Sequence, residues 1–281
     1  MPAEKSLEAK LEEARCLLRS LERVAVAFSG GVDSTFLLKV AADTLGPDNV
    51  LAVTAESETA VPGELEFARN AARQMQVTHQ IIRTHELEDP NFVANEADRC
   101  YHCRKLVYEQ IKQVAARQGF HQLICGVNAD DQDDWRPGIR AGHEQGLRAP
   151  CAEAGLTKQD IRTLSERMGL PTADKPAMPC LATRIAYGQT ITPAKLQMVA
   201  EAEAFLHRLG LRQCRVRHHG NLARIEVPAD RIAELMQPAT RDRIERHLRQ
   251  IGYTFVAMDL RGFRSGSMNE ALDSRSDEVD R

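Results

Sequence analysis

A chain of 281 residues, 43% hydrophobic and 27% charged, has the composition of a soluble globular protein and is long enough for two domains. The net charge of −3 argues against proteins that bind nucleic acid or an anionic membrane, although arginine clusters could still bind small anions. The start is polar and helical in pattern, without a signal peptide's apolar stretch, and no later run approaches a membrane span. We therefore expect a cytoplasmic protein that binds neither nucleic acid nor membranes and keeps its seven cysteines reduced.

The first part of the chain alternates apolar strands with helices, after an N-terminal helix within residues 1–22. Such alternation predicts an α/β fold with a parallel sheet covered on both faces, which we assign to residues 23–188. Residues 128–146 lack clean periodicity and contain Gly and Pro, so we interpret them as a long functional loop. The expected strands are 23–28, 50–55, 79–84 and 121–128, and the expected helices are 35–46, 63–75, 103–119 and 157–169.

The pattern changes after Gly188 and predicts a small α+β domain at residues 189–264. We expect the polar segment 265–281 to be a flexible tail. The expected elements of the small domain are a helix at 192–210, a hairpin at 214–227, helical residues at 230–252 that Pro238 can break, and a strand at 253–260.

The stretch SGGVDST, residues 29–35, follows a predicted strand and opens a predicted helix. Gly30 and Gly31 allow a tight turn whose N–H groups can face an anion, and the helix N-terminus adds partial positive charge. Asp33 could hold magnesium on a polyphosphate. A plain strand-to-helix turn is the alternative, but the whole string in this context favours phosphate binding. It is not a Walker loop, because no lysine precedes Ser34.

Cys100 and Cys103 form a C-x-x-C pair at the start of a predicted helix. The spacing suits redox exchange or two ligands of a metal, and zinc would need two further ligands. The alternative is that both are small, half-buried residues. By contrast, we expect the cysteines in apolar-periodic segments to be buried and unreactive, namely Cys16, Cys125 and Cys214.

Cys180 lies within KPAMPCLATRIAY, residues 175–187. Two prolines stiffen its approach, so the thiol could be held where it must react. Lys175 and Arg184 supply positive charge that would favour a reactive thiolate. The alternative is a buried apolar cysteine in a loop.

Several of these stretches together resemble a family of ATP pyrophosphatases. SGGVDS resembles their PP-loop, and KPAMPCLATRIAYG resembles a motif of the LarE family, the ATP-dependent sulfurtransferases of pyridinium-3,5-biscarboxylic acid mononucleotide. The stretches AVTAES, GVNADDQDDWRPG and RVRHHGNLARIEV agree with the same family, so the resemblance spans residues 24–227. It implies a PP-loop (adenine nucleotide alpha hydrolase-like) sheet with a small C-terminal domain, and a homohexamer.

The resemblance also implies a reaction and a set of site residues. A substrate carboxylate is adenylated by ATP with magnesium, sulfur then displaces AMP, and the thiocarboxylate leads to the nickel-pincer nucleotide. Thr54 and Ser57 would lie near adenine and Gly126 near the ribose. The implied phosphate-binding residues are Ser29, Gly30, Gly31, Val32, Asp33, Ser34 and Thr35, and the implied substrate-binding residues are Arg184, Glu203, Arg215, Arg217 and Glu226.

Two sulfur sources occur in this family. In one, the cysteine matching Cys180 loses its own sulfur and becomes dehydroalanine, which would require a general base for which the acidic residues of 130–134 are candidates. In the other, three cysteines hold a 4Fe–4S cluster that carries an extra sulfide. This sequence has all three, Cys100, Cys103 and Cys180, so we favour the cluster.

Other functions remain open at this stage. Without the resemblance, Arg215 and Arg217 would be interpreted as a solvated hairpin face with cross-strand ion pairs. A transfer RNA thiolase also combines a PP-loop with paired cysteines, although the acidic balance argues against it. An ammonia-using PP-loop ligase would not need Cys180. A nucleotide-gated metal or sulfur carrier would bind ATP without releasing pyrophosphate.

Overall fold

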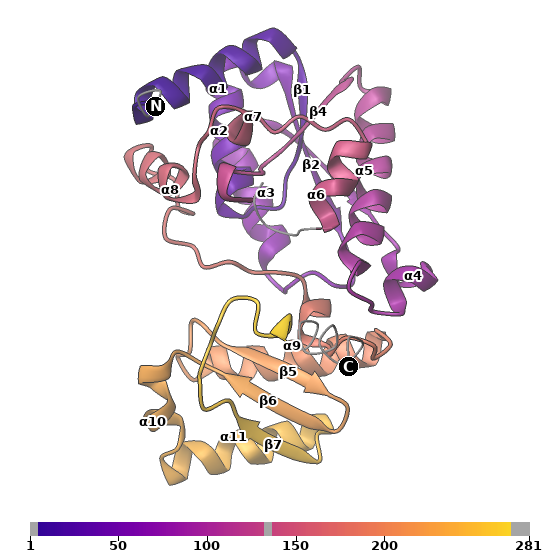
Figure 1. Cartoon of the computed structure of the whole chain (residues 1–281), viewed down its shortest axis with the longest axis vertical. Helices are drawn as coiled ribbons and strands as arrows, with labels where there is room; N and C mark the ends of the chain where they lie inside the picture. Colours follow the sequence, from indigo (N-terminus) through magenta and orange to yellow (C-terminus); the bar gives the residue numbers. More distant parts are fainter. Residues whose placement is uncertain (1–4, 132–136, 271–281) are drawn as a thin grey trace, which may run out of the picture. The chain divides into compact units, whose positions relative to one another are not determined.

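The computed structural model describes residues 5–131 and 137–270 (Figure 1). Contacts divide the chain into two compact units. The first contains the residues up to Glu86 together with Cys100–Met178, and the second contains Leu87–Arg99 and the residues from Pro179 onward. Within the described ranges, no helix combines the length and apolarity that a membrane span requires.

The first unit is built on a four-stranded sheet whose neighbouring strands are all parallel, in the order β3-β2-β1-β4. The predicted α/β fold with a parallel sheet is therefore confirmed. Because the strands are parallel, their carboxyl ends meet at one edge of the sheet, where open α/β sheets bind ligands. The strands are β1 (Val24–Ala27), β2 (Val50–Glu56), β3 (Thr78–Arg83) and β4 (Gln122–Cys125).

Helices cover both faces of this sheet, as the continuous apolar runs of its strands require. In β1, Val24 and Val26 point into one core, whereas Ala25 points into the other. Helix α5 (Arg99–Arg117) covers the Ala25 face, opposite α1 and α2 (Figure 1). The helices packed on the Val24 face are α1 (Leu7–Leu21), α2 (Val32–Leu45), α3 (Glu64–Gln74), α7 (Pro150–Glu153) and α8 (Lys158–Arg167).

The prediction of a long loop at residues 128–146 is wrong for much of that range. Residues Ala129–Asp131 form a 3₁₀ turn and Pro137–Glu144 form helix α6, while 132–136 lie outside the described residues. Proline occupies the first turn of α6, where its missing N–H is tolerated. A Cβ at Gly138 would lie 3.0 Å from the Arg104 side chain, so this glycine permits a close approach to α5 rather than breaking the helix.

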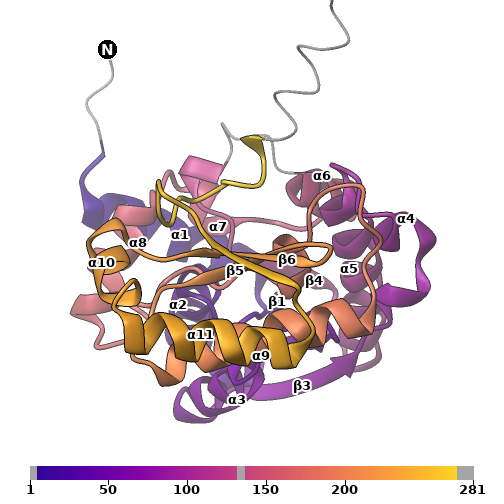
Figure 2. The same ribbon diagram turned by 90° about the horizontal axis from the view of Figure 1, so that it is seen from below.

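The second unit confirms the predicted α-β-β-α-β order. Its sheet has the order β5-β6-β7, with β5 and β6 antiparallel and β7 parallel to β6. Helices α9 and α11 lie side by side against the sheet (Figure 2), and Pro238 begins α11, where a break was expected. The elements are α9 (Pro193–Arg208), β5 (Arg215–His219), β6 (Leu222–Glu226), α10 (Ile232–Leu235), α11 (Pro238–Ile251) and β7 (Phe255–Met258).

The boundary between the units differs from the expected position at Gly188. The segment Leu87–Arg99, which contains the short helix α4 (Pro90–Val93), belongs to the second unit, and Asn95 makes several of its contacts there. This buried residue adopts φ 61°, and its side-chain amide donates to the backbone carbonyls of Ala186 and Gln189 at 2.8 and 2.9 Å. Together with the Val93 carbonyl, which accepts from the Ile191 N–H at 2.9 Å, this asparagine ties an early segment to the chain that follows Cys180.

The prediction of a flexible tail from residue 265 is wrong for residues 265–270. Ser267 and Met268 are buried, and the Ser267 hydroxyl donates to the Glu226 carboxylate at 2.7 Å. A buried carboxylate needs such donors, which explains why this polar segment is ordered. The rest of the predicted tail, 271–281, lies outside the described residues.

Candidate functional site

The loop between β1 and α2 has little room for side chains. Gly30 has φ +72°, and a Cβ at this position would lie 3.2 Å from Ala68 of α3. Gly31 is the N-cap of α2, which begins at Val32. A Cβ at Gly126, just after β4, would lie only 2.7 Å from the Ser34 amide nitrogen. The structure therefore brings Gly126 against the first turn of α2, whose free N–H groups attract anions.

The hydroxyl groups of the loop differ in their surroundings. Ser29 and Ser34 contact each other at 3.1 Å between their Oγ atoms, and the Ser34 hydroxyl lies 3.3 Å from the Gly31 carbonyl oxygen. These bonds shape the loop. Thr35 is fully buried, and its hydroxyl has no partner within the part of the chain that the structure describes. Thr35 therefore presents no side-chain hydroxyl at the surface of the loop.

Asp33 lies in the first turn of α2 and forms an ion pair that sequence analysis missed. Its Oδ2 accepts from Nζ of Lys158, the first residue of α8, at 2.5 Å. Its Oδ1 is buried and lacks a hydrogen-bond partner among the described residues. An unsatisfied buried carboxylate oxygen is unfavourable, so this atom is suited to accept a cation.

Lys175 contacts the same loop from another side. Its ammonium donates to the Gly30 carbonyl at 3.0 Å, pairs with Glu64 at 2.8 Å, and lies 3.8 Å from the centre of the Phe67 ring. The expectation that Lys175 lends its charge to Cys180 is thus not supported, since the ammonium is bonded to the Gly30 carbonyl and to Glu64.

The two residues expected near adenine already use their hydroxyls. Thr54 donates to the Phe28 carbonyl at 2.6 Å and contacts Nε2 of His79 at 2.7 Å. Burial, and secondarily the charge of Arg69, lowers the pKa of His79, which keeps its imidazole neutral at pH 7. A nucleotide base near β2 would therefore meet backbone groups rather than a free Thr54 hydroxyl.

Glu86 is a buried acidic residue beside the C-x-x-C pair that sequence analysis did not single out. It is buried, and its carboxylate accepts from Ser57 and Thr84, both at 3.0 Å. Its Oε1 is also 3.9 Å from the sulfur of Cys103. Glu86 thus connects the end of β2 with the C-x-x-C pair. No sequence pattern marks it, because its three contacts come from separate elements.

Cys100 and Cys103 lie in the first turns of α5, are partly exposed, and share one side of the helix. Cys180 is also partly exposed but belongs to the second unit, where it caps the 3₁₀ helix Leu181–Arg184. Across residues 5–131 and 137–270, no three His, Cys, Asp or Glu side chains are grouped as metal ligands.

The remaining cysteines are mostly buried. Burial raises the pKa of Cys125 to about 11 and that of Cys214 to about 12, and it also raises the pKa of Cys151. These thiols stay protonated and are poor nucleophiles. The expectation that Cys16 is buried is wrong, because it lies on the exposed side of α1.

Arg184 is fully buried and bonded in every direction. Its Nε and Nη2 donate to the two carboxylate oxygens of Glu203 at 2.9 and 3.0 Å. Its Nη1 donates to the carbonyls of Pro179 and Cys180 at 2.5 and 3.0 Å. Neither Arg184 nor Glu203 presents a free polar group to a ligand. Arg184, held by Glu203, instead fixes the backbone at Cys180.

The predicted arginine pair of β5 is also buried. Arg217 donates to Glu226 at 2.7 Å and to Ser267 at 3.0 Å, and its Nε has no hydrogen-bond partner in the described part of the chain. Arg215 donates to the Cys214 carbonyl and lies over the Phe263 ring. Burial, followed by the charge of Arg184, lowers the pKa of Arg215 to about 10, so it remains cationic at pH 7.

Two acidic candidates for a general base are engaged elsewhere. Asp130 accepts from the backbone N–H of Lys158 at 2.8 Å, and Asp131 accepts from that of Asn128 at 3.1 Å. Residues 133 and 134 lie outside the described residues.

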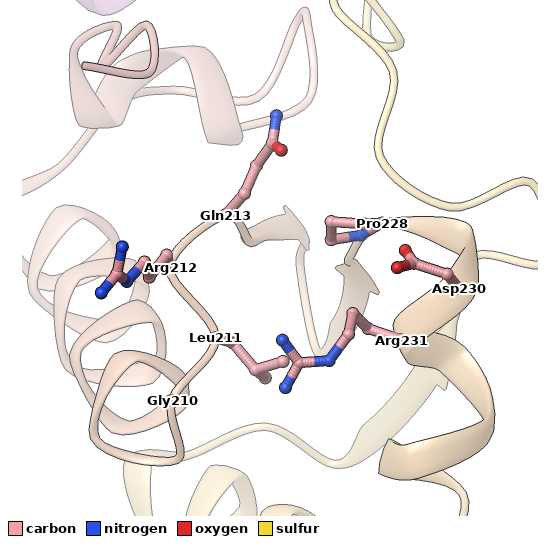
Figure 3. Close-up of a pocket in the computed structure, with 7 residues that line it drawn as sticks. All are labelled: Gly210, Leu211, Arg212, Gln213, Pro228, Asp230 and Arg231. Carbon is pink, nitrogen blue, oxygen red and sulfur yellow. The ribbon is translucent and has the colours of Figure 1, made fainter. Parts of the chain in front are cut away.

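A surface hollow of about 280 Å³ in the second unit contains none of the predicted site residues (Figure 3). The guanidinium of Arg231, which lines it, pairs with Glu234 at 2.6 Å. Its lining residues are Gly210, Leu211, Arg212, Gln213, Pro228, Asp230 and Arg231.

Comparison with known proteins identifies relatives along nearly the whole chain. Residues 3–135 match the PP-loop domain family. An uncharacterized protein of Synechocystis sp. is 43% identical over 95% of this chain and 99% of its own length. A pyridinium-3,5-bisthiocarboxylic acid mononucleotide synthase of Lactiplantibacillus plantarum is 39% identical over 91% of this chain and 92% of its own length. Argininosuccinate synthase of Natronomonas pharaonis is 27% identical over only 53% of this chain.

Proposed function

Because this chain belongs to the LarE family of PP-loop sulfurtransferases, we propose that it uses ATP to adenylate a carboxylate of pyridinium-3,5-biscarboxylic acid mononucleotide and then replaces AMP by sulfur. The protein is an ATP-dependent sulfurtransferase whose thiocarboxylate product serves as a precursor of the nickel-pincer nucleotide. The observation that carries the proposal is the 39% identity, across both units, to a synthase of the bisthiocarboxylate.

The first unit supplies the nucleotide site at the carboxyl ends of its strands. The N–H groups of Gly31, Val32 and Asp33 would bind the phosphates, helped by the partial positive charge of α2. The Asp33 carboxylate, with its unsatisfied oxygen, would hold magnesium. Gly126 would lie near the ribose, and the lack of a side chain at this position lets it pack against the first turn of α2.

The chemistry has two balanced steps. A carboxylate oxygen attacks the α-phosphorus of ATP, and pyrophosphate leaves with the electron pair of the broken P–O bond. A sulfur nucleophile then attacks the activated carbonyl carbon, the C–O bond to the phosphate breaks, and AMP leaves. Adenylation is required because a free carboxylate is a poor electrophile, and a thiolate is a strong nucleophile for the second step.

We propose that Cys100, Cys103 and Cys180 hold a 4Fe–4S cluster, which when bound would supply sulfide repeatedly. The donor set fits, since all three thiols are partly exposed and two share one side of α5. This requires the two units to bring their cysteines together. The alternative, in which Cys180 gives up its own sulfur, leaves the other two cysteines without a role.

The second unit would bind the substrate, whose phosphate and carboxylates suit guanidinium groups. We propose Arg215 and Arg217, oriented by Glu226, for this contact. For Arg184 and Glu203 we propose that they act on the substrate only through Cys180, because their own polar groups are saturated. The family resemblance further implies a homohexamer, which light scattering of the purified protein would test.

One experiment tests the reaction and the sulfur source together. Protein purified without oxygen is mixed with ATP, magnesium and the biscarboxylate nucleotide, and pyrophosphate, product, iron, sulfide and the mass of the Cys180 peptide are measured. Product that tracks iron, with an unchanged peptide, is expected. A peptide lighter by hydrogen sulfide would establish sacrifice of Cys180 instead. Absence of substrate-dependent pyrophosphate would refute the proposed reaction.

A further inference from the structure

The PP-loop of this chain contains no lysine, yet the fold brings one to it. Lys158 is separated from Asp33 by 125 positions, and its ammonium lies 2.5 Å from the Asp33 carboxylate. Phosphate-binding loops of the Walker type carry such a lysine within the loop itself. Here the equivalent charge arrives from the N-terminus of a different helix, α8.

The backbone at Lys158 is held in place, so that its side chain reaches out from a fixed base. Thr157 caps α8 through a reciprocal pair of hydrogen bonds with Asp160, and Asp160 also pairs with Lys10 at 2.9 Å. The Lys158 N–H donates to Asp130 at 2.8 Å. These contacts fix the position of Lys158 beside the first turn of α2.

The two lysines at this loop differ in how firmly their ammonium groups are bound. Lys175 is 14% exposed and bonds to Glu64, to the Gly30 carbonyl and to an aromatic ring, which together give it a structural role. Lys158 is 37% exposed, and in the described part of the chain its ammonium has one ion-pair partner, Asp33. Lys158 can therefore change partners at little structural cost.

We propose that Lys158 is a further nucleotide-binding residue, whose ammonium neutralises Asp33 in the empty site and transfers to the terminal phosphates of ATP when magnesium binds Asp33. This inference rests on the proposed function. The exchange keeps Asp33 paired with a cation throughout and adds one positive charge to the phosphates that leave as pyrophosphate. The first turn of α2 offers only partial charges, so a full cation there should bind phosphate more strongly.

The test compares ATP with AMP, which lacks the two terminal phosphates. Calorimetric titrations with magnesium present are made on the full chain and on Lys158→Met, Lys158→Arg and Lys39→Met. Lys158→Met loses a charge-assisted contact to the terminal phosphates, so its dissociation constant for ATP should rise about tenfold. Its dissociation constant for AMP should stay within about twofold of that of the unchanged protein. Lys158→Arg should retain most of the ATP affinity. Lys39 pairs with Asp43 further along α2, so Lys39→Met is the matched control. It should change the affinity for neither ATP nor AMP.

The outcomes separate this inference from the proposed function. If the unchanged protein does not bind ATP, the proposed function fails. If it does bind ATP, and Lys158→Met binds ATP equally well, Lys158 does not contact the phosphates. Equal losses for ATP and AMP would show that Lys158 only supports the fold of the loop, and they would also overturn the inference.

Discussion

Arg184 and Glu203 form a bidentate ion pair in the interior of the second unit, with N–O distances of 2.9 and 3.0 Å. The same guanidinium donates to the carbonyl of Cys180. The backbone at Cys180 is therefore held by a charge that is buried and balanced. The ion pair that stabilises the second unit therefore also positions the backbone that carries the Cys180 sulfur.

Replacing Glu203 by Gln should destabilise the second unit strongly. The change leaves the buried Arg184 guanidinium without its counter-charge, which costs about 3–5 kcal/mol in comparable buried pairs. Urea unfolding followed by circular dichroism measures the loss. The matched control is Glu201→Gln, an exposed position on the same helix, which should be nearly neutral. Equal stabilities for the two variants would contradict the structural role of the pair.

A methyl group at Gly126 should disrupt nucleotide binding. Its carbon would lie 2.7 Å from the Ser34 nitrogen, so the first turn of α2 must move away from β4. We expect Gly126→Ala to lose ATP affinity and about 1–3 kcal/mol of stability, the usual cost of overpacking. Gly142→Ala, where the added carbon meets the Tyr108 ring at an ordinary 3.6 Å, is the control. An unchanged dissociation constant for ATP in Gly126→Ala would show that the loop tolerates displacement.

Asp33→Asn should reduce the magnesium dependence of ATP binding. The amide keeps the shape of the side chain but removes the charge that a hard cation prefers. The magnesium concentration for half-maximal pyrophosphate release should rise by about tenfold, a change that corresponds to about 1.4 kcal/mol. Asp43→Asn, also on α2 but paired with Lys39, provides the comparison. If Asp33→Asn needs no more magnesium than Asp43→Asn, the metal is held elsewhere.

The stability of the protein should fall as the pH is lowered through the range in which histidine titrates. Burial lowers the pKa of His79, His218 and His219 below the ordinary value of 6.5, so the unfolded chain binds more protons than the folded one. Stability is then complete above about pH 6.5 and is lost as pH falls toward the lowered pKa values.

Unfolding free energies between pH 7.5 and about pH 5.5 measure this effect, because most carboxylates remain ionised there. His79→Gln keeps a hydrogen-bond donor for Thr54 but cannot titrate, and it should make the pH dependence shallower. A slope that is identical in this variant would exclude His79 as a contributor.

The elements of this protein follow closely from local sequence. The apolar run before Ser29, the glycines after it and the helical pattern beyond act on their immediate neighbours, so strand, loop and helix could all be predicted. The helix α6 was missed because Gly138 resembles a breaker until its contact with Arg104 is known. The ordered residues around Ser267 were missed because their partner, Glu226, is 41 positions away.

The sequence by itself determined the α/β order, the PP-loop at 29–35, the unusual setting of Cys180 and, through its motifs, the family. Tertiary structure alone decided which charges meet. It paired Lys158 with Asp33, placed Glu86 between Ser57 and Cys103, and used Arg184 to hold the backbone at Cys180. The reason is physical: periodicity and turn preferences depend on neighbouring residues, whereas the partner of a buried charge depends on how distant helices and strands pack.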